Sequence, residues 1–203
     1  AVDLILNCKG KVIFAGIGKS GLIAKKISAT FSSVGIPSFF CDPAQALHGD
    51  MGQIEKKDIL IIFSYSGNTS ELTNMLKYGN RYRIKIIGVA SKPESILLKA
   101  SDIKLILPRV KEADITGMVP TSSTSITLLL GDCLATTVMN QKKFSKEKFK
   151  IFHPGGNIGK SLLLAKDIMI SGKKMPTINY KKNFEKALKI MNQKKLGIIV
   201  ILK

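Results

Sequence analysis

The 203-residue chain contains no tryptophan, only two histidines and only three cysteines. The cysteines, Cys8, Cys41 and Cys133, are odd in number, far apart and without CxxC spacing. This pattern predicts reduced thiols and argues against a disulfide framework or a zinc site. No apolar run is long enough to cross a bilayer, and the first residues do not resemble a signal peptide. We therefore expect a cytoplasmic protein with no membrane segment and no bound metal.

Arginine and acidic residues are also scarce. The chain has 32 basic and 14 acidic residues, a net charge of +18, yet only Arg81, Arg83 and Arg109 are arginines. Nucleic-acid recognition favours arginine forks and aromatic side chains, whereas the lysines here are spread along the chain. The charge therefore indicates solvated lysine-rich faces that attract small anions, and we expect no nucleic-acid partner. A nucleic-acid binder with salt-sensitive affinity remains the lowest-ranked alternative.

Short apolar runs alternate with helical stretches through the first half of the chain. Strands are expected at residues 11–15, 38–41, 59–63, 84–89 and 104–107, with helices between them. This alternation predicts an α/β fold, a parallel sheet with helices on both faces. Ligands of such sheets bind beyond the carboxyl ends of the strands, so the loops that follow the strands are the places to search for a site.

Two of these loops have the composition of an anion site. Residues 64–69 follow a fully apolar strand and contain Ser64, Ser66 and Thr69 before an expected helix at 69–80, but they lack the lysine of a nucleotide-triphosphate loop. Residues 16–21 have the spacing GxGxxG, a weak signal, since no acidic residue stands where a dinucleotide ribose would need one. We interpret this second loop as another backbone approach to a phosphorylated ligand. Lys19 at its tip is either a ligand contact or a solvated surface lysine.

Four consecutive hydroxyl residues at 121–124 precede a long apolar helix expected at about 125–140. One hydroxyl would serve as an ordinary helix cap, and four exceed that need. The helix carries a single charge, Asp132, and belongs either in the core or at a subunit interface. The two histidines, His48 and His153, both lie beside glycine or proline in polar loops, so structural and catalytic roles stay open for each.

Taken together and in order, six motifs resemble the arabinose-5-phosphate isomerase family. They are residues 16–21, 48–50 (His-Gly-Asp), 64–69, Glu112, 120–124 (Pro-Thr-Ser-Ser-Thr) and 153–156 (His-Pro-Gly-Gly). The resemblance covers essentially the whole chain. It implies a sugar isomerase (SIS) domain, a three-layer sandwich with a flavodoxin-like parallel sheet, over residues 1–165. It also implies the start of a CBS module at 167–203. The composition changes after Lys166, which predicts a linker near 165–167, and the start at Ala1 and the apolar run at 198–202 look like cuts through a longer protein.

The resemblance implies interconversion of D-ribulose 5-phosphate and D-arabinose 5-phosphate, which supplies octulosonate synthesis for lipopolysaccharide or capsule. The reaction moves a proton between C1 and C2 through an enediol and needs neither a metal nor a cofactor. A homo-oligomer, often a tetramer with shared active sites, is implied as well. The catalytic positions carried over are Lys19, Glu112, His153 and His48. The positions carried over for substrate and phosphate binding are Gly18, Ser20, Ser64, Ser66, Asn68, Thr69, Thr121, Ser122, Ser123 and Thr124.

Within this assignment, His153 moves the C1/C2 proton, Glu112 handles hydroxyl protons or orients the histidine, and Lys19 neutralises the oxyanion. His48 is the alternative base or opens the sugar ring. The chain departs from the family at Asn68 and at Gln45, where relatives commonly carry glutamate, and Glu71 is a possible substitute for the first. Other SIS sugar-phosphate isomerases and a non-catalytic sugar-phosphate sensor are the competing interpretations.

Overall fold

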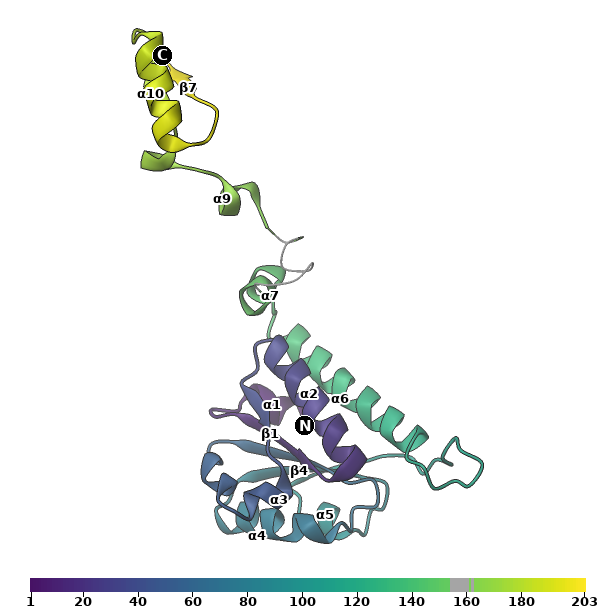
Figure 1. The fold of residues 1–203 in the computed structure, drawn as a ribbon. Helices are drawn as coiled ribbons and strands as arrows, with labels where there is room; N and C mark the ends of the chain where they lie inside the picture. The colour runs from purple at the N-terminus through teal and green to yellow at the C-terminus, as the bar shows by residue number, and fades with distance from the viewer. Residues whose placement is uncertain (154–160, 162) are drawn as a thin grey trace. The chain divides into compact units, whose positions relative to one another are not determined.

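A computed structural model describes residues 1–153, 161 and 163–203 of the chain (Figure 1). The chain divides into two compact units, Ala1–Pro154 and Gly155–Lys203, and each is described by itself. In the described ranges, no helix combines the length and the apolar character that a membrane crossing requires.

The first unit is built on one five-stranded sheet in which every neighbouring pair is parallel. Its strands are β1 (Val12–Gly16), β2 (Ser38–Phe40), β3 (Ile59–Phe63), β4 (Lys85–Ala90) and β5 (Ile103–Ile106). Their order is β2-β1-β3-β4-β5, the flavodoxin-like arrangement. The predicted parallel α/β sheet is therefore confirmed, with each strand within one residue of its expected bounds.

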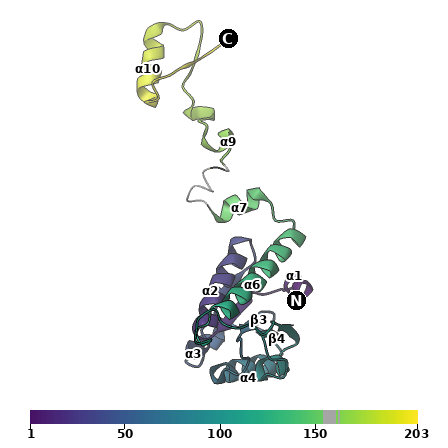
Figure 2. The same cartoon turned by 90° about the vertical axis from the view of Figure 1, so that its right-hand side faces the viewer.

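Helices cover both faces of this sheet (Figures 1 and 2). On one face lie α1 (Val2–Leu6), α2 (Gly18–Ser33) and α6 (Ser122–Gln141), which share a buried cluster with Phe14 and Phe63. On the other face lie α3 (Pro43–Ala46), α4 (Thr73–Arg81) and α5 (Ile96–Lys99), which pack around Ile13 and Leu60. Because successive residues of a strand point to opposite faces, the apolar runs of β1 and β3 fill both layers of the core. The three-layer sandwich predicted from the resemblance is present.

The strands β1 and β3 are followed by helices on opposite faces of the sheet. Strand β1 continues into α2, whereas β3 continues through the short 3-10 helix η2 (Ser70–Leu72) into α4 on the other side. Gly16 and Phe63 pair at the carboxyl ends of these strands. A crevice between strands whose connections diverge in this way is the usual ligand position in open parallel sheets.

Two helices begin earlier than the sequence pattern predicted. Helix α2 begins at Gly18 rather than near residue 22, and α6 begins at Ser122 rather than 125. Lys19 therefore lies in the first turn of a helix and not at the tip of a loop. The turn needs glycine at position 21, because a Cβ there would come within 2.5 Å of the carbonyl oxygen of Gly16.

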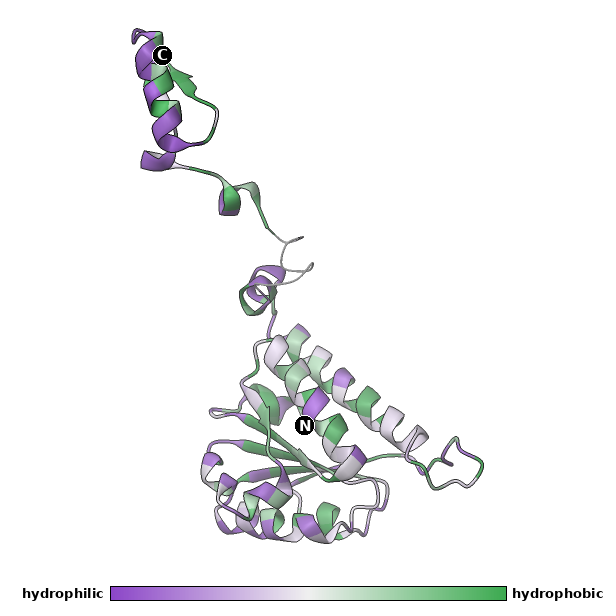
Figure 3. Cartoon of the chain, viewed as in Figure 1, coloured by the Kyte–Doolittle hydropathy of each residue, from purple (hydrophilic) through white to green (hydrophobic). Residues whose placement is uncertain are grey.

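After α6 the chain forms α7 (Lys146–Phe152), which contacts the end of α2: a Cβ at Gly35 would lie 3.3 Å from the ring of Phe152. The second unit contains α9 (Ala165–Ile168), η3 (Gly172–Lys174), β6 (Thr177–Asn179), α10 (Phe184–Lys194) and β7 (Val200–Leu202). Strands β6 and β7 pair in parallel, and α10 alternates polar and apolar stretches along its length (Figure 3). The division between the two units falls between residues 154 and 155 of the chain, earlier than the predicted linker near 165–167. The assignment of 167–203 to a CBS module stays a prediction.

Candidate active site

A cavity of about 300 Å³ lies at the carboxyl end of the sheet, between the first turn of α2, the end of β3 and the first turn of α6. Eight predicted site residues line it: Lys19, Ser20, Ser64, Ser66, Thr69, Glu112, Ser123 and Thr124. Five further lining residues were not predicted: Ile17, Ile23, Tyr65, Pro120 and Thr127. The structure therefore gathers most of the predicted polar positions from three separate segments into one site.

The loop of residues 64–69, called the phosphate loop after its predicted role, is stabilised by hydrogen bonds of its own hydroxyl groups. Ser64 is buried, and its hydroxyl lies 2.8 Å from that of Thr69 and accepts from the Gly67 N–H at 3.1 Å. Gly67 has a φ of +69°, and a Cβ there would also lie within 3.0 Å of the Cβ of Ala90. A residue with a side chain is therefore excluded at this turn. Ser66 is an exposed residue that lines the cavity, and its hydroxyl accepts from the Asn68 N–H at 3.3 Å.

The first turn of α2 gives the cavity its positive character. Helix N-termini carry unpaired N–H groups and a partial positive charge, which together bind phosphate-type anions. Lys19 and Ser20, both in this turn, add an ammonium group and a hydroxyl donor to the cavity wall. The turn therefore has the donors and the charge to hold a phosphate group.

Glu112, in the irregular segment before α6, bonds through its side chain to the N-terminus of that helix. One of its carboxylate oxygens accepts from the Thr121 N–H at 2.8 Å, the Thr121 hydroxyl at 3.1 Å and the Ser123 N–H at 3.2 Å. Thr121 precedes the helix but makes no capping bond with its own side chain. Hydrogen bonds from Ser123 and Thr121 lower the pKa of Glu112 from its ordinary value to about 2. Glu112 is therefore an ionised cap of α6 at neutral pH.

Four predicted binding residues lie beside the cavity but do not line it: Gly18, Asn68, Thr121 and Ser122. The side chain of Asn68 accepts the N–H of Ile96, the first residue of α5, at 3.0 Å. The phosphate loop is joined to the same segment by a bond from the Leu97 N–H to the Gly67 carbonyl at 3.0 Å. Asn68 thus ties the loop to α5, and its predicted contact with substrate stays untested. Glu71 lies in η2 and accepts a hydrogen bond from Ser70 at 2.8 Å.

Neither histidine lies at the cavity. His48 is exposed between α3 and the 3-10 helix η1 (Asp50–Gln53). His153 ends α7, where its Nδ1 lies 2.9 Å from the carbonyl oxygen of Phe149 and its ring stacks on that of Phe149. The remaining residues of that motif, 154–156, lie outside the described residues.

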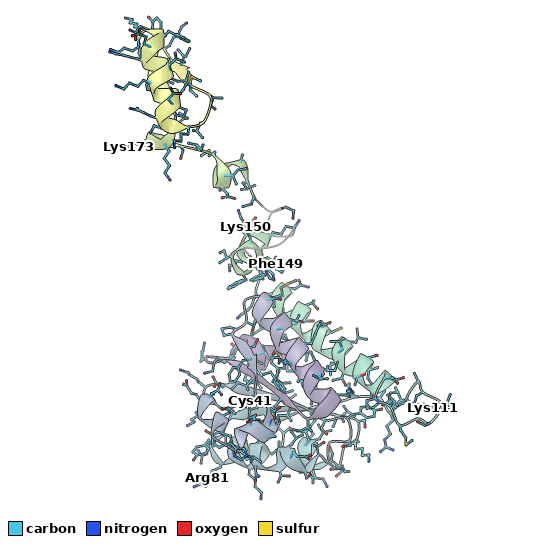
Figure 4. All side chains as sticks on the ribbon, in the orientation of Figure 1. Cys41, Arg81, Lys111, Phe149, Lys150 and Lys173 are labelled. Atoms are coloured by element: carbon cyan, nitrogen blue, oxygen red, sulfur yellow. The ribbon has the colours of Figure 1, made fainter. Side chains whose placement is uncertain are left out.

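The position of α7 separates His153 from the cavity of its own chain. Helix α7 contacts the C-terminal end of α2, whereas Lys19 lies in the first turn of α2. Sixteen residues of α-helix span about 24 Å. Figure 4 shows the two ends: Lys111, next to Glu112, is near the start of α6, and Phe149 is beyond its other end. The described chain therefore brings Lys19 and Glu112 together but not His153.

Of the residues missed from the sequence, Thr127 had a usable signal. It follows Ser123 by four positions, so the two share one face of α6, and its hydroxyl donates to the Ser123 carbonyl at 2.7 Å. Ile17 and Ile23 gave no signal, because apolar residues flanking a strand–helix turn are ordinary core residues. Across the described ranges, no group of three or more His, Cys, Asp or Glu side chains is arranged to hold a metal ion.

Comparison with known proteins identifies the family of the domain that contains the cavity. The model of the SIS domain family matches residues 5–137. The chain belongs to the SIS domain family. The matched range contains every lining residue of the cavity, so the site described above lies wholly within the SIS domain.

Among the proteins similar to this SIS domain protein, KdsD and a structure in complex with arabinose 5-phosphate agree by name with the resemblance inferred from its motifs. It is 42% identical over 202 residues to the arabinose 5-phosphate isomerase KdsD of Escherichia coli K12, covering 99% of this chain and 62% of that protein. It is 43% identical over 200 residues to protein RP505 of Rickettsia prowazekii, covering 98% and 62%. The solved structure of c3406 from Escherichia coli CFT073, in complex with arabinose 5-phosphate, matches with a TM-score of 0.74 and 37% identity, covering 75% of this chain and 81% of that one. The chain thus spans about 62% of the length of these curated relatives.

Proposed function

We propose that the protein interconverts D-ribulose 5-phosphate and D-arabinose 5-phosphate, as an aldose–ketose isomerase. The observation that carries the proposal is the cavity where Lys19, Glu112 and the phosphate loop converge at the carboxyl end of the sheet. Its volume of about 300 Å³ suits a small phosphorylated sugar. The similarity to KdsD and to the arabinose 5-phosphate complex supports this substrate in preference to other sugar phosphates. In this proposal, the D-arabinose 5-phosphate formed supplies octulosonate synthesis for lipopolysaccharide or capsule.

One end of the cavity is more positively charged than the other, and in this proposal the difference orients the substrate. The N-terminus of α6 is already neutralised by Glu112, whereas that of α2 carries Lys19. The phosphate therefore binds between the first turn of α2 and the phosphate loop. The sugar carbons extend toward Glu112 and the α6 hydroxyls, Ser123 and Thr124.

The proton transfer belongs to a histidine in this mechanism. With a pKa of about 2, Glu112 stays ionised at neutral pH and is a weak base, so we assign it orientation of the substrate hydroxyls and not the transfer itself. The backbone N–H groups of the α2 turn and the loop hydroxyls hold the phosphate in this proposal, and the ammonium group of Lys19, on its flexible four-carbon stem, reaches past the phosphate to stabilise the enediolate oxygen. No metal is required. His153 can serve as the base only if another copy of the chain supplies it, as in the shared sites that a homo-oligomer would have. His48 is the alternative base.

Product identification tests the proposal directly. The purified protein is incubated with D-ribulose 5-phosphate, with and without EDTA, and the aldose formed is identified by chromatography. We expect D-arabinose 5-phosphate at the same rate in both samples. Formation of a different aldose would assign the chain to another sugar-phosphate isomerase, and binding without turnover would make it a sensor.

Lys19→Ala tests the oxyanion role. We expect kcat to fall by about 100-fold or more, because removal of a single transition-state donor has effects of this size. Lys77→Ala is the matched control: it removes the same charge from an exposed position on α4, on the other face of the sheet, and should leave kcat unchanged. Equal effects of the two substitutions would show that Lys19 contributes only to overall charge.

A further inference from the structure

Tyr65 lies between the two serines of the phosphate loop, and its two ends contact different segments. Its carbonyl accepts from the N–H and the hydroxyl of Ser91, after β4, at 2.8 and 2.7 Å. Its phenol oxygen accepts from the Val110 N–H at 2.8 Å and donates to the Pro108 carbonyl at 3.2 Å. The half-buried ring packs against the core cluster of α2 and α6. One residue therefore joins the ends of β3 and β4 to the segment that follows β5.

That segment, residues 108–121, makes a long crossing within the SIS domain. Strand β5 is an edge of the sheet, whereas α6 packs on α2 beside β1. The connection must pass the carboxyl ends of the intervening strands, and it contains no helix or strand. Its last ladder bond to the sheet runs from the Leu107 N–H to the Ala90 carbonyl at 2.9 Å. Beyond that bond, Tyr65 contacts it at positions 108 and 110, just before Glu112.

Glu112 is consequently held from both sides. On its C-terminal side, its carboxylate is bonded to the α6 N-terminus. On its N-terminal side, the chain two residues earlier is bonded to the Tyr65 hydroxyl. Without the bonds to Tyr65, the start of the irregular segment could move and displace Glu112 with it. A displacement of about 1 Å in a group that contacts substrate can lower the rate of catalysis about 100-fold.

We propose that Tyr65 is a positioning residue for the isomerase reaction: its hydroxyl fixes the segment 108–110 so that Glu112 faces the sugar of a substrate whose phosphate the same loop binds. This inference rests on the proposed function. It assigns Tyr65 a role distinct from that of its neighbours Ser64 and Ser66, which act through the phosphate.

Tyr65→Phe isolates the hydroxyl, because the ring and the backbone bonds to Ser91 remain. We expect kcat to fall about tenfold, the effect of removing a hydrogen bond worth about 1.4 kcal/mol, while KM for D-ribulose 5-phosphate stays within about twofold. Tyr78→Phe is the matched control: its hydroxyl also donates to a backbone carbonyl, that of Ile54 at 3.4 Å, but on α4 away from the cavity. An unchanged kcat in Tyr65→Phe, or an equal fall in Tyr78→Phe, would overturn the proposal.

A double-mutant cycle tests whether Tyr65 acts through Glu112. If it does, Tyr65→Phe should change kcat by less than about twofold in the Glu112→Gln background, because the group that it positions is already altered. Effects that multiply would mean that Tyr65 acts independently of Glu112, and the inference would fail. A fall in thermal stability alone would leave the cycle multiplicative and would not imitate this result.

Amide hydrogen exchange separates the failure of this inference from failure of the proposed function. In Tyr65→Phe, the amides of residues 109–113 should exchange faster than in the wild type, whereas Tyr78→Phe should leave them unchanged. If the wild-type protein forms no D-arabinose 5-phosphate, the proposed function fails and exchange still tests the bond to the segment. Unchanged exchange at 109–113 would refute the positioning role whatever the substrate.

Discussion

Gly131→Ala is expected to destabilise the protein and to widen the cavity at the carboxyl end of the sheet. Gly131 lies on the face of α6 that packs on α2, and a Cβ there would come 2.5 Å from Cγ1 and 3.0 Å from Cγ2 of Ile27. Ordinary carbon–carbon contacts are about 3.5–4.0 Å, so the deficit is about 1 Å. Ile27 is fully buried, and these atoms belong to its branch point, so the side chain cannot simply rotate away. The two helices must move apart.

The expected change in the free energy of unfolding is the sum of two opposing effects. Alanine gains about 1 kcal/mol over glycine in a helix, whereas overpacking of a core costs about 1–3 kcal/mol. Because the overlap involves a branched side chain, we place the cost at the upper end and expect a net loss of about 2 kcal/mol. Urea unfolding should measure it. KM should also rise, because α2 and α6 each contribute one wall of the cavity.

Gly79→Ala is the comparison that makes this reasoning refutable. Gly79 is buried on α4, but the closest contacts of its Cβ would be terminal methyl groups, Ile86 Cδ1 at 2.8 Å and Leu60 Cδ1 at 3.2 Å. These can shift by rotation, so the helix gain and the packing cost should nearly cancel, with no change in KM. A Gly131→Ala protein as stable as the wild type, or less affected than Gly79→Ala, would contradict the argument.

Three further outcomes are expected. Asn68→Ala should lower the unfolding free energy by about 1 kcal/mol, measured by urea titration, because the Ile96 N–H loses its acceptor. Asp58→Ala should cost about 3 kcal/mol in the same assay, since this buried carboxylate accepts two backbone N–H bonds and pairs with Lys11 at 3.3 Å. Glu112 has a folded-state pKa lowered from 4.5 to about 2, so its stabilisation is complete above pH 4.5 and is lost as the pH falls toward 2. Glu112→Gln should therefore flatten the pH dependence of stability in that window.

The sheet could be predicted from sequence because its signal is local. Five apolar residues in succession at 59–63, followed by small hydroxyl residues, identify a strand buried on both faces and the loop after it. The starts of α2 and α6 were placed too late because glycine and hydroxyl residues are typical of loops, although the first helical turn tolerates them. Local propensity is a weak guide where tertiary contacts stabilise a helix end.

The role of Glu112 could not be predicted in the same way. The sequence marked it as a catalytic position and marked the hydroxyls at 121–124 as helix caps or ligands. The structure joins the two, because the carboxylate caps the helix from nine residues away. Such a bond depends on the path of an irregular segment, and the hydrophobic periodicity of a sequence does not predict that path. The same holds for Asn68, which the sequence offered as a ligand contact and whose side chain accepts a backbone N–H of α5.

The capping of α6 by Glu112 bears on which ligands the cavity can bind, because the cavity lies between two helix N-termini. A site with two free N-termini would attract two anionic groups, as a bisphosphate or a nucleotide offers. Here one of them is neutralised by Glu112, and the other carries Lys19 beside the phosphate loop. A ligand with one phosphate at one end and hydroxyl groups at the other fits this asymmetry. A second phosphate would lie against an ionised carboxylate, so the arrangement of charge favours a ligand with one phosphate, such as the proposed sugar phosphate, over a bisphosphate.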